Sequence, residues 1–98
     1  MTSNLKEWLA LNGYSQDNLN SVGKYGNSAI MKASREANLS IVDELISLNV
    51  DLNVKNIDGN SALWNACFGD SYACFEALVS AGINIDSQNV NNVTSLMY

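Results

Sequence analysis

The apolar residues of this chain fall into short stripes with the spacing of helices. One stripe near the N-terminus comprises Leu5, Trp8, Leu9 and Leu11. Two later stripes share the i, i+1, i+4, i+5 spacing of a buried helix, and they comprise Ile41, Val42, Leu45, Ile46 and Leu48, then Cys74, Phe75, Leu78 and Val79. The pattern predicts a short amphipathic helix over residues 4–12 and two buried helices farther along the chain.

The same stripes belong to an internal repeat with a period of 33 residues. The sequence GNSAIMKA at residues 26–33 recurs as GNSALWNA at residues 59–66, and a related NVTSLMY follows at residues 92–98. The segments after the two buried stripes, residues 49–53 and 82–86, keep the same offset. A constant offset over successive copies indicates a repeat array.

Each copy carries residues that begin and end helices. Ser28 and Ser61 precede apolar stretches, where a hydroxyl can accept a hydrogen bond from a helix N–H, so we expect them to cap a first helix. Asn49 and Gly82 follow the second helices, where a left-handed residue is favoured. With turn residues at 58–59, each unit is predicted to run helix, turn, helix, β-turn.

The period and the motif resemble the ankyrin repeat family, whose units read G-x-T-P-L-H-x-A and end in G-A-D-x-N. The resemblance covers residues 23–98. The family's threonine is matched by Ser28, Ser61 and Thr94. Its proline is replaced by Ala29, Ala62 and Ser95, and its histidine by Met31, Trp64 and Met97. Each repeat thereby loses a fixed φ angle and a side-chain hydrogen bond, which predicts a softer array.

The resemblance implies an all-α fold with short β-hairpin turns, an ankyrin-like helix-turn-helix solenoid in a single domain. We expect an N-terminal capping helix and loop at residues 1–22, a first repeat at 23–55, a second at 56–88, and the start of a truncated third at 89–98. Trp8 is expected to anchor the capping helix.

The third copy raises the question of what covers the last full repeat. Tyr98 falls inside the predicted first helix of that copy, shortly after Thr94. A solenoid without a polar end exposes apolar surface, here parts of Phe75, Leu78 and Val79. We expect the chain to be a fragment of a longer array, with self-association through this face as the alternative.

Composition narrows the chemistry and the partners. The chain has 98 residues, a formal net charge of −5 and no histidine. A negative surface disfavours nucleic acid and anionic membranes as partners and favours a basic protein. The absence of histidine argues against catalytic triads and against the common zinc and haem sites. We therefore expect no catalytic residues, no bound metal and no cofactor.

The remaining chemistry points to a cytoplasmic protein. The N-terminus lacks the features of a signal peptide, and no apolar run reaches the length of a membrane span. Cys67 and Cys74 are expected to be small buried apolar residues, because disulfides are rare in reducing compartments. Trp64, at the family's histidine position, is expected in the core against the base of the next hairpin.

The resemblance also implies a function and a site. Ankyrin repeats hold protein partners on hairpin tips and on the exposed face of the first helices, without catalysis. The corresponding tip residues here are Lys24, Tyr25, Asn27, Ile57, Asp58, Asn60, Val90, Asn91 and Val93, and the helix residues are Arg35, Glu36 and Phe68. Tyr25 and Phe68 are the leading candidates, because aromatic residues dominate interface energetics. An alternative for Ile57 and Val90 is cross-hairpin pairing.

Two other functions remain open from the sequence. The chain could act mainly by self-association through its C-terminal repeat face, giving a homo-oligomer. It could also be a small acidic inhibitor or immunity-type protein, whose charge suits the basic surface of an enzyme such as a nuclease.

Overall fold

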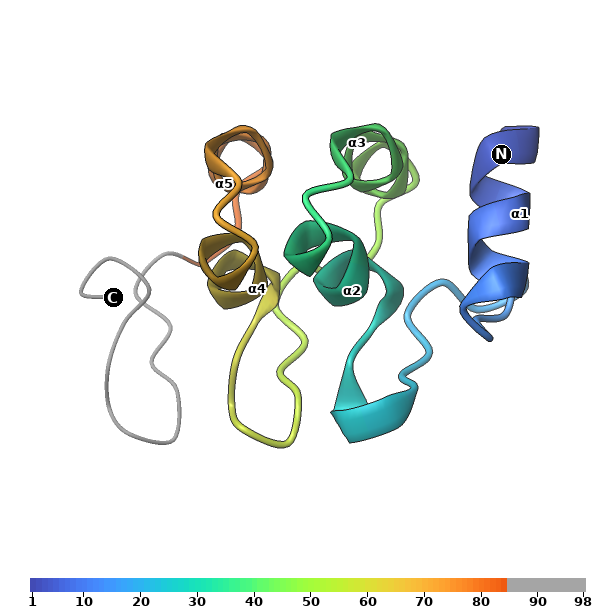
Figure 1. The fold of residues 1–98 in the computed structure, drawn as a ribbon, viewed down its shortest axis with the longest axis horizontal. Helices are drawn as coiled ribbons and strands as arrows, with labels where there is room; N and C mark the ends of the chain where they lie inside the picture. The colour runs from blue at the N-terminus through green and yellow to red at the C-terminus, as the bar shows by residue number, and fades with distance from the viewer. Residues whose placement is uncertain (85–98) are drawn as a thin grey trace.

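The computed structural model describes residues 1–84, which form a stack of helical hairpins (Figure 1). The elements of this part are α1 (Ser3–Leu11), the 3-10 helix η1 (Lys24–Gly26), α2 (Ala29–Arg35), α3 (Leu39–Ser47), α4 (Ala62–Phe68) and α5 (Tyr72–Ser80). Helices α2 and α3 form one helix-turn-helix unit, and α4 and α5 form the next. The predicted all-α solenoid is confirmed, whereas the expected third copy at 89–98 lies outside the described residues.

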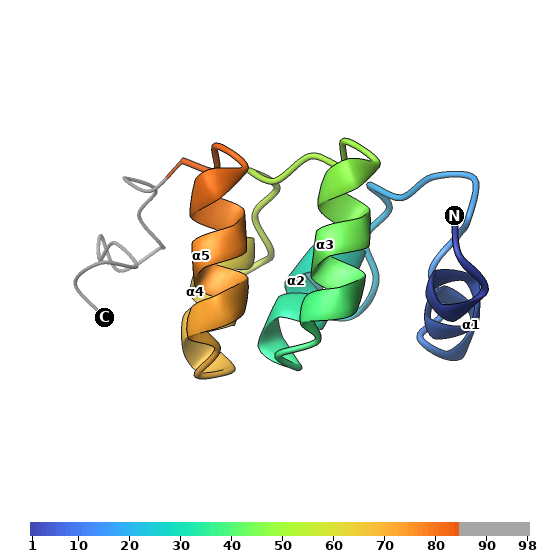
Figure 2. The same cartoon turned by 90° about the horizontal axis from the view of Figure 1, so that it is seen from above.

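The two units stack as two layers of helices. Helix α2 packs against α4 in the inner layer, and α3 packs against α5 in the outer layer, where Figure 2 shows them side by side. The loops at residues 22–28 and 55–61 project from the inner layer, away from the outer helices (Figure 1). Ala33 and Ala66 are fully buried, and their small side chains allow close approach between the inner helices.

The inner helices begin differently from our expectation. Ser28 and Ser61 occupy the N-cap positions of α2 and α4, but neither side chain makes a capping hydrogen bond. Both serines are buried, and their hydroxyl oxygens have no hydrogen-bond partner among the described residues. The prediction of side-chain caps is wrong here, because both side chains are enclosed by the protein and do not reach the helix N–H groups.

The outer helices end as predicted. Asn49 and Gly82 follow α3 and α5 with left-handed backbones, at φ of 59° and 92°. In both cases the next amide closes the helix end, from Val50 to the carbonyl of Leu45 and from Ile83 to the carbonyl of Leu78. Helix α1 ends in the same way: Gly13 has a φ of 76°, and the next amide donates to the carbonyl oxygen of Leu9. Helix α1 therefore ends like an outer helix of the array.

Helix α1 covers the open side of the first unit. It begins one residue earlier than predicted, and it runs across the direction of α3 and α5 (Figures 1 and 2). Two of its own side chains, Leu5 and Leu9, are fully buried. The prediction that Leu11 shares their face is wrong: Leu11 is 86% exposed. A step of two residues turns a helix through roughly 200°, which places Leu11 on the opposite side from Leu9.

The apolar stripes of the outer helices are only partly buried. The buried members are Ile41, Val42 and Leu45 in α3, and Cys74 and Leu78 in α5. Leu48 is 39% exposed, which corrects its predicted place in the buried stripe. Val79 is also 39% exposed, which agrees with the expectation that it is partly exposed on the last full repeat. Leu48 is the C-cap residue and so lies beyond the regular helix. Leu78 is fully buried, so the expectation that it is partly exposed is also wrong.

The predicted burial is confirmed for Trp64 and Cys74 but not for Cys67. Trp64 is 2% exposed, and its ring lies against that of Phe68, with centroids 5.6 Å apart. Cys67 and Cys74 are not joined by a disulfide; Cys74 is buried and Cys67 half-buried.

Candidate functional site

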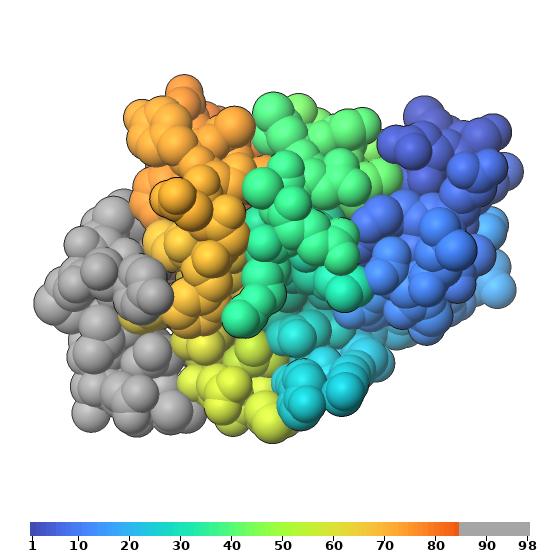
Figure 3. Space-filling view, viewed as in Figure 1, coloured from blue at the N-terminus to red at the C-terminus, as the bar shows by residue number. Residues whose placement is uncertain are grey.

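The exposed candidate residues lie mainly at the tips of the two hairpins. Helix η1 forms the first tip and presents Lys24 and Tyr25, of which Tyr25 is 59% exposed. The second tip presents Ile57, which is 69% exposed, and Asp58. Asn27, at the end of the first tip, is half-buried. Figure 3 shows the two tips against each other along one edge of the molecule.

Hydrogen bonds join these tips. The Ile57 N–H donates to the carbonyl oxygen of Tyr25 over 3.0 Å, and the Asn56 side-chain amide donates to the Asn27 Oδ1 over 2.9 Å. Gly26 permits this close approach, since a Cβ there would lie 3.3 Å from the Ile57 nitrogen and its φ is 73°. The cross-hairpin pairing of Ile57 therefore uses its backbone, and its side chain stays exposed.

Asn60 does not belong to the exposed tip. It is 7% exposed and lies at the base of the second hairpin. Its N–H donates to the Asn56 Oδ1, and its carbonyl oxygen accepts from the Asn56 N–H, both over 3.0 Å. The expectation that Asn60 contacts a partner is corrected: its backbone closes the hairpin, and its side chain is buried.

Two of the predicted helix residues meet at the inner layer. The Arg35 guanidinium lies over the Phe68 ring, 5.3 Å from its centroid. Phe68 is half-buried, because its ring also packs against Trp64. Only part of the Phe68 ring is available to a partner, whereas Arg35 is exposed. The last three candidates, Val90, Asn91 and Val93, lie outside the described residues.

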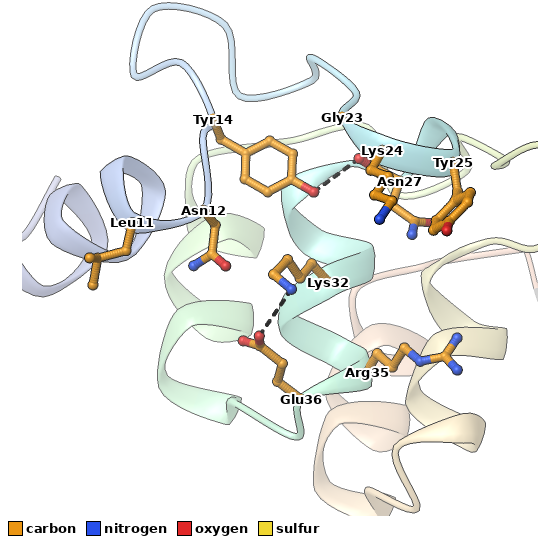
Figure 4. Close-up of a pocket in the computed structure, with 10 residues that line it drawn as sticks. All are labelled: Leu11, Asn12, Tyr14, Gly23, Lys24, Tyr25, Asn27, Lys32, Arg35 and Glu36. Carbon is orange, nitrogen blue, oxygen red and sulfur yellow. Dashed lines mark hydrogen bonds and ion pairs between the residues drawn. The ribbon is translucent and has the colours of Figure 1, made fainter.

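A cleft of about 570 Å³ opens between the segment that follows α1 and the surface formed by η1 and α2 (Figure 4). We call it the N-terminal cleft. Its lining unites residues that the sequence singled out with others that it did not. The first set is Lys24, Tyr25, Asn27, Arg35 and Glu36; the second is Leu11, Asn12, Tyr14, Gly23 and Lys32.

A network around Glu36 fixes one wall of the cleft. The Trp8 indole N–H donates to one Glu36 carboxylate oxygen over 3.1 Å, and the Lys32 ammonium lies 3.3 Å from the other. Tyr14 stacks on Trp8, with ring centroids 6.0 Å apart, and its hydroxyl donates to the Asn27 carbonyl oxygen over 3.0 Å. Burial and the nearby Glu36 charge raise the pKa of Tyr14, so it remains a neutral hydrogen-bond donor.

The sequence carried a signal for this wall that our assignment of residues 1–22 to a capping helix and loop missed. Asn18-Leu19-Asn20 matches Asp51-Leu52-Asn53 at the same offset of 33. In the structure the Asn20 Oδ1 accepts the Asp51 N–H over 2.7 Å, and the Asn53 Oδ1 accepts the Asn84 N–H over 2.9 Å. The segment after α1 is thus held on the first unit as that unit is held on the second.

A second hollow, of about 390 Å³, lies where α4 meets α5. Cys67, Tyr72 and Phe75 are among its lining residues, and Tyr72 is 77% exposed. Burial raises the pKa of the Cys67 thiol, which disfavours the thiolate needed for nucleophilic chemistry.

Within residues 1–84, no three histidine, cysteine or acidic side chains come close enough together to hold a metal ion. The helices of the same residues include none that is both long and apolar enough to cross a membrane.

Comparison with known families agrees with this architecture. A family model described as ankyrin repeats, in three copies, matches residues 2–98. Ankyrin repeats are generally protein–protein interaction modules, and the family is typically a non-catalytic scaffold. The match includes the N-terminal helix, whose end resembles those of the outer helices. This match, together with the 33-residue period and the stacked helical hairpins, shows that the chain belongs to the ankyrin repeat family.

Proposed function

We propose that this protein binds a partner protein through its hairpin tips and inner-helix surface and performs no catalysis. The observation that carries this proposal is the exposure of two large side chains, Tyr25 and Ile57, on neighbouring tips that are bonded to each other. Scattered exposed apolar residues are common, but two on adjacent, mutually fixed tips form a continuous contact surface.

The mechanism is preorganisation. The bonds from Ile57 to Tyr25 and from Asn56 to Asn27 hold the tips in place before a partner arrives. Binding then costs less conformational entropy than it would if loops had to be ordered.

The raised pKa of the Cys67 thiol supports the non-catalytic part of the proposal. The buried free thiol of Cys74 supports a cytoplasmic setting.

The test is a comparison of partner association among three matched variants. Crosslinked partners of the tagged chain are quantified in its source cells for Tyr25→Ala, Ile57→Ala and Tyr72→Ala. Tyr72 is also a large exposed residue, but it lies on the outer helix α5. The two tip variants should lose most of the crosslinked partner with unchanged circular dichroism, and the α5 variant should retain it. Equal recovery from all three would refute binding through the tips.

Self-association is the second candidate, favoured by the hollow beside α4 and α5 with its exposed Tyr72. Light-scattering mass at two protein concentrations tests it. A dimer that forms with concentration and disappears in Tyr72→Ala supports this function, and a monomer at both concentrations contradicts it.

A further inference from the structure

The positive charges of this acidic chain are concentrated in the N-terminal cleft. The chain has five basic residues, and three of them, Lys24, Lys32 and Arg35, line the cleft. Of its ten acidic residues, Glu36 alone is among the lining residues that the structure describes. A cleft surrounded by an otherwise negative molecule thus presents a local excess of positive charge.

Within the cleft, no acidic group of the described residues neutralises the charges of Lys24 and Arg35. Glu36 is already engaged by Lys32 and by the Trp8 indole. The Lys24 ammonium lies 5.1 Å from the Tyr25 ring centroid, and Arg35 lies over Phe68. No carboxylate of residues 1–84 lies within ion-pairing distance of Lys24 or Arg35. The aromatic rings orient the two cations without cancelling their charge.

Apolar surface is contributed by the end of α1 and the segment after it, across the cleft from these cations (Figure 4). Tyr14 is fixed by its stacking on Trp8 and by its hydroxyl hydrogen bond, and its ring points into the cleft (Figure 4). Leu11, at the cleft edge, is 86% exposed. The cleft volume of about 570 Å³ lies in the range of sites that enclose a small ligand or a few side chains.

We propose that the N-terminal cleft binds a short acidic segment of a partner protein. Carboxylates of that segment would pair with Lys24 and Arg35, and an apolar side chain of the same segment would pack on Tyr14 and Leu11 on the other side of the cleft. This inference rests on the proposed protein-binding function and specifies the chemistry of the partner. It reverses, for this cleft, the expectation of a basic partner, which came from the net charge alone.

The net charge favours a short peptide over a long polyanion. Nucleic acid would place a continuous row of phosphates along a molecule whose net charge is −5, and repulsion outside the cleft would oppose binding. A segment with a few carboxylates meets only the local positive charge. Charge-assisted hydrogen bonds to Arg and Lys are among the stronger polar contacts in interfaces.

The experiment selects ligands without assuming a sequence. A library of random nine-residue peptides displayed on phage is selected on the wild-type chain, and enriched peptides are measured as free peptides by isothermal titration calorimetry. The expected peptides are rich in Asp and Glu around one apolar residue. Lys24→Gln and Arg35→Gln should each weaken binding about tenfold. Binding should also weaken as salt is raised.

Lys6→Gln is the matched control, since it removes the same charge from an exposed position on α1 outside the cleft lining. It should leave peptide affinity unchanged. Enriched peptides that are neutral or basic, equal affinity for Lys24→Gln and wild type, or no enrichment at all would each overturn the inference. The proposed function is tested separately by the effect of Ile57→Ala on crosslinking to the natural partner. Ile57 does not line the cleft, so this result does not depend on whether the cleft binds acidic peptides.

Discussion

Single residues decide how each helix of the array ends. Left-handed residues follow the outer helices at Gly13, Asn49 and Gly82, where glycine and asparagine tolerate the conformation. The inner helix α2 ends in the same conformation but at an alanine, Ala37, whose φ is 58°. The left-handed conformation is sterically unfavourable for alanine, since its Cβ approaches the backbone carbonyl. Ala37 is thus a locally strained position on an exposed turn.

Replacement of Ala37 by glycine should relieve this strain. We expect Ala37→Gly to raise the free energy of unfolding by about 0.5 kcal/mol, because the steric relief exceeds the added entropy of the unfolded chain. Urea unfolding followed by far-ultraviolet circular dichroism measures the change. Ala10→Gly, on the exposed side of α1, should instead lower stability by about 1 kcal/mol, as glycine does in a helix. A loss of stability in Ala37→Gly would contradict the strain.

Glu44 makes the stability of the first unit depend on pH. The Thr2 hydroxyl and the Thr2 backbone N–H both donate to its carboxylate, over 2.5 and 2.7 Å. These two bonds and the nearby N-terminal charge lower the pKa of Glu44 from its ordinary value of 4.5. A lowered pKa in the folded state stabilises the protein above the ordinary value, and the contribution disappears as pH falls through the folded value.

Glu44→Gln should therefore flatten the acid side of the stability profile. The free energy of unfolding of the wild type should fall more steeply than that of the variant between about pH 6 and about pH 3, because glutamine has no charge to lose. Urea unfolding at several pH values gives both profiles. Glu7→Gln leaves the bonds between Thr2 and Glu44 in place and should keep the wild-type slope. Parallel profiles for wild type and Glu44→Gln would argue against this role.

The sequence predicted those single-residue conformations that are set by the intrinsic preferences of the residue type. Asn49 and Gly82 were predicted as left-handed, since glycine and asparagine are favoured there. Ala37 was not, because alanine carries no such preference and adopts the conformation only under the constraint of the surrounding fold. Ser28 failed as a cap for a related reason: cap propensity is local, whereas the burial of its side chain is set by the packed array.

Contact between inner helices depends on the absence of a side chain at Gly69. Its φ of −77° is accessible to any residue, so glycine is not needed here for its backbone freedom. A Cβ at this position would lie 2.4 Å from the Arg35 carbonyl oxygen and 2.9 Å from that of Ser34. Those atoms end α2 and cannot move without moving the helix. Gly69 therefore sets how closely α4 approaches α2.

Gly69→Ala should lower the free energy of unfolding by about 1–3 kcal/mol, the usual cost of overpacking a tight contact. Chemical unfolding monitored by circular dichroism measures this change in the free energy of unfolding. Gly23→Ala serves for comparison, because the nearest neighbour of a Cβ there would be the Tyr14 side chain, at an ordinary distance of 3.5 Å. It should cost less than Gly69→Ala, and equal losses would mean that the close approach is not responsible.

Helix type and order followed from periodicity, but the position of α1 did not. Leu5 and Leu9 share a helix face, which was enough to predict a capping helix. The direction in which α1 crosses the outer helices depends on contacts between distant residues, such as Trp8 with Glu36 and Thr2 with Glu44. No local pattern encodes those pairs. The N-terminal cleft was missed for the same reason, as its walls come from segments that meet only in the folded chain.

The molecule as a whole is held in register by equivalent asparagines. Asn20 accepts the Asp51 N–H, and Asn53, 33 residues later, accepts the Asn84 N–H. Asn56 and Asn27 add a side-chain bond between the hairpins. The stability of a repeat protein depends on such interactions between neighbouring units, because each unit contacts only the adjacent ones. These bonds couple the units along the whole described array.

Removal of one of these bonds should weaken the array. Asn53→Ala should lower the free energy of unfolding by about 1 kcal/mol, the typical net contribution of a hydrogen bond. Asn53→Asp keeps an acceptor for the Asn84 N–H and should retain most of that stability. Urea unfolding distinguishes the two variants. An alanine variant as stable as the aspartate variant would show that the bond contributes nothing measurable.

The bonding of the hairpins separates the residues that maintain the fold from those that face outward. Backbone atoms and asparagine amides join the tips, so the side chains of Tyr25 and Ile57 take no part in those bonds. Substitution at the two positions alters the chemistry offered to a partner with little effect on stability. Binding preference in this array can therefore diverge one residue at a time, and the same two positions are suitable sites for randomised libraries in binder engineering.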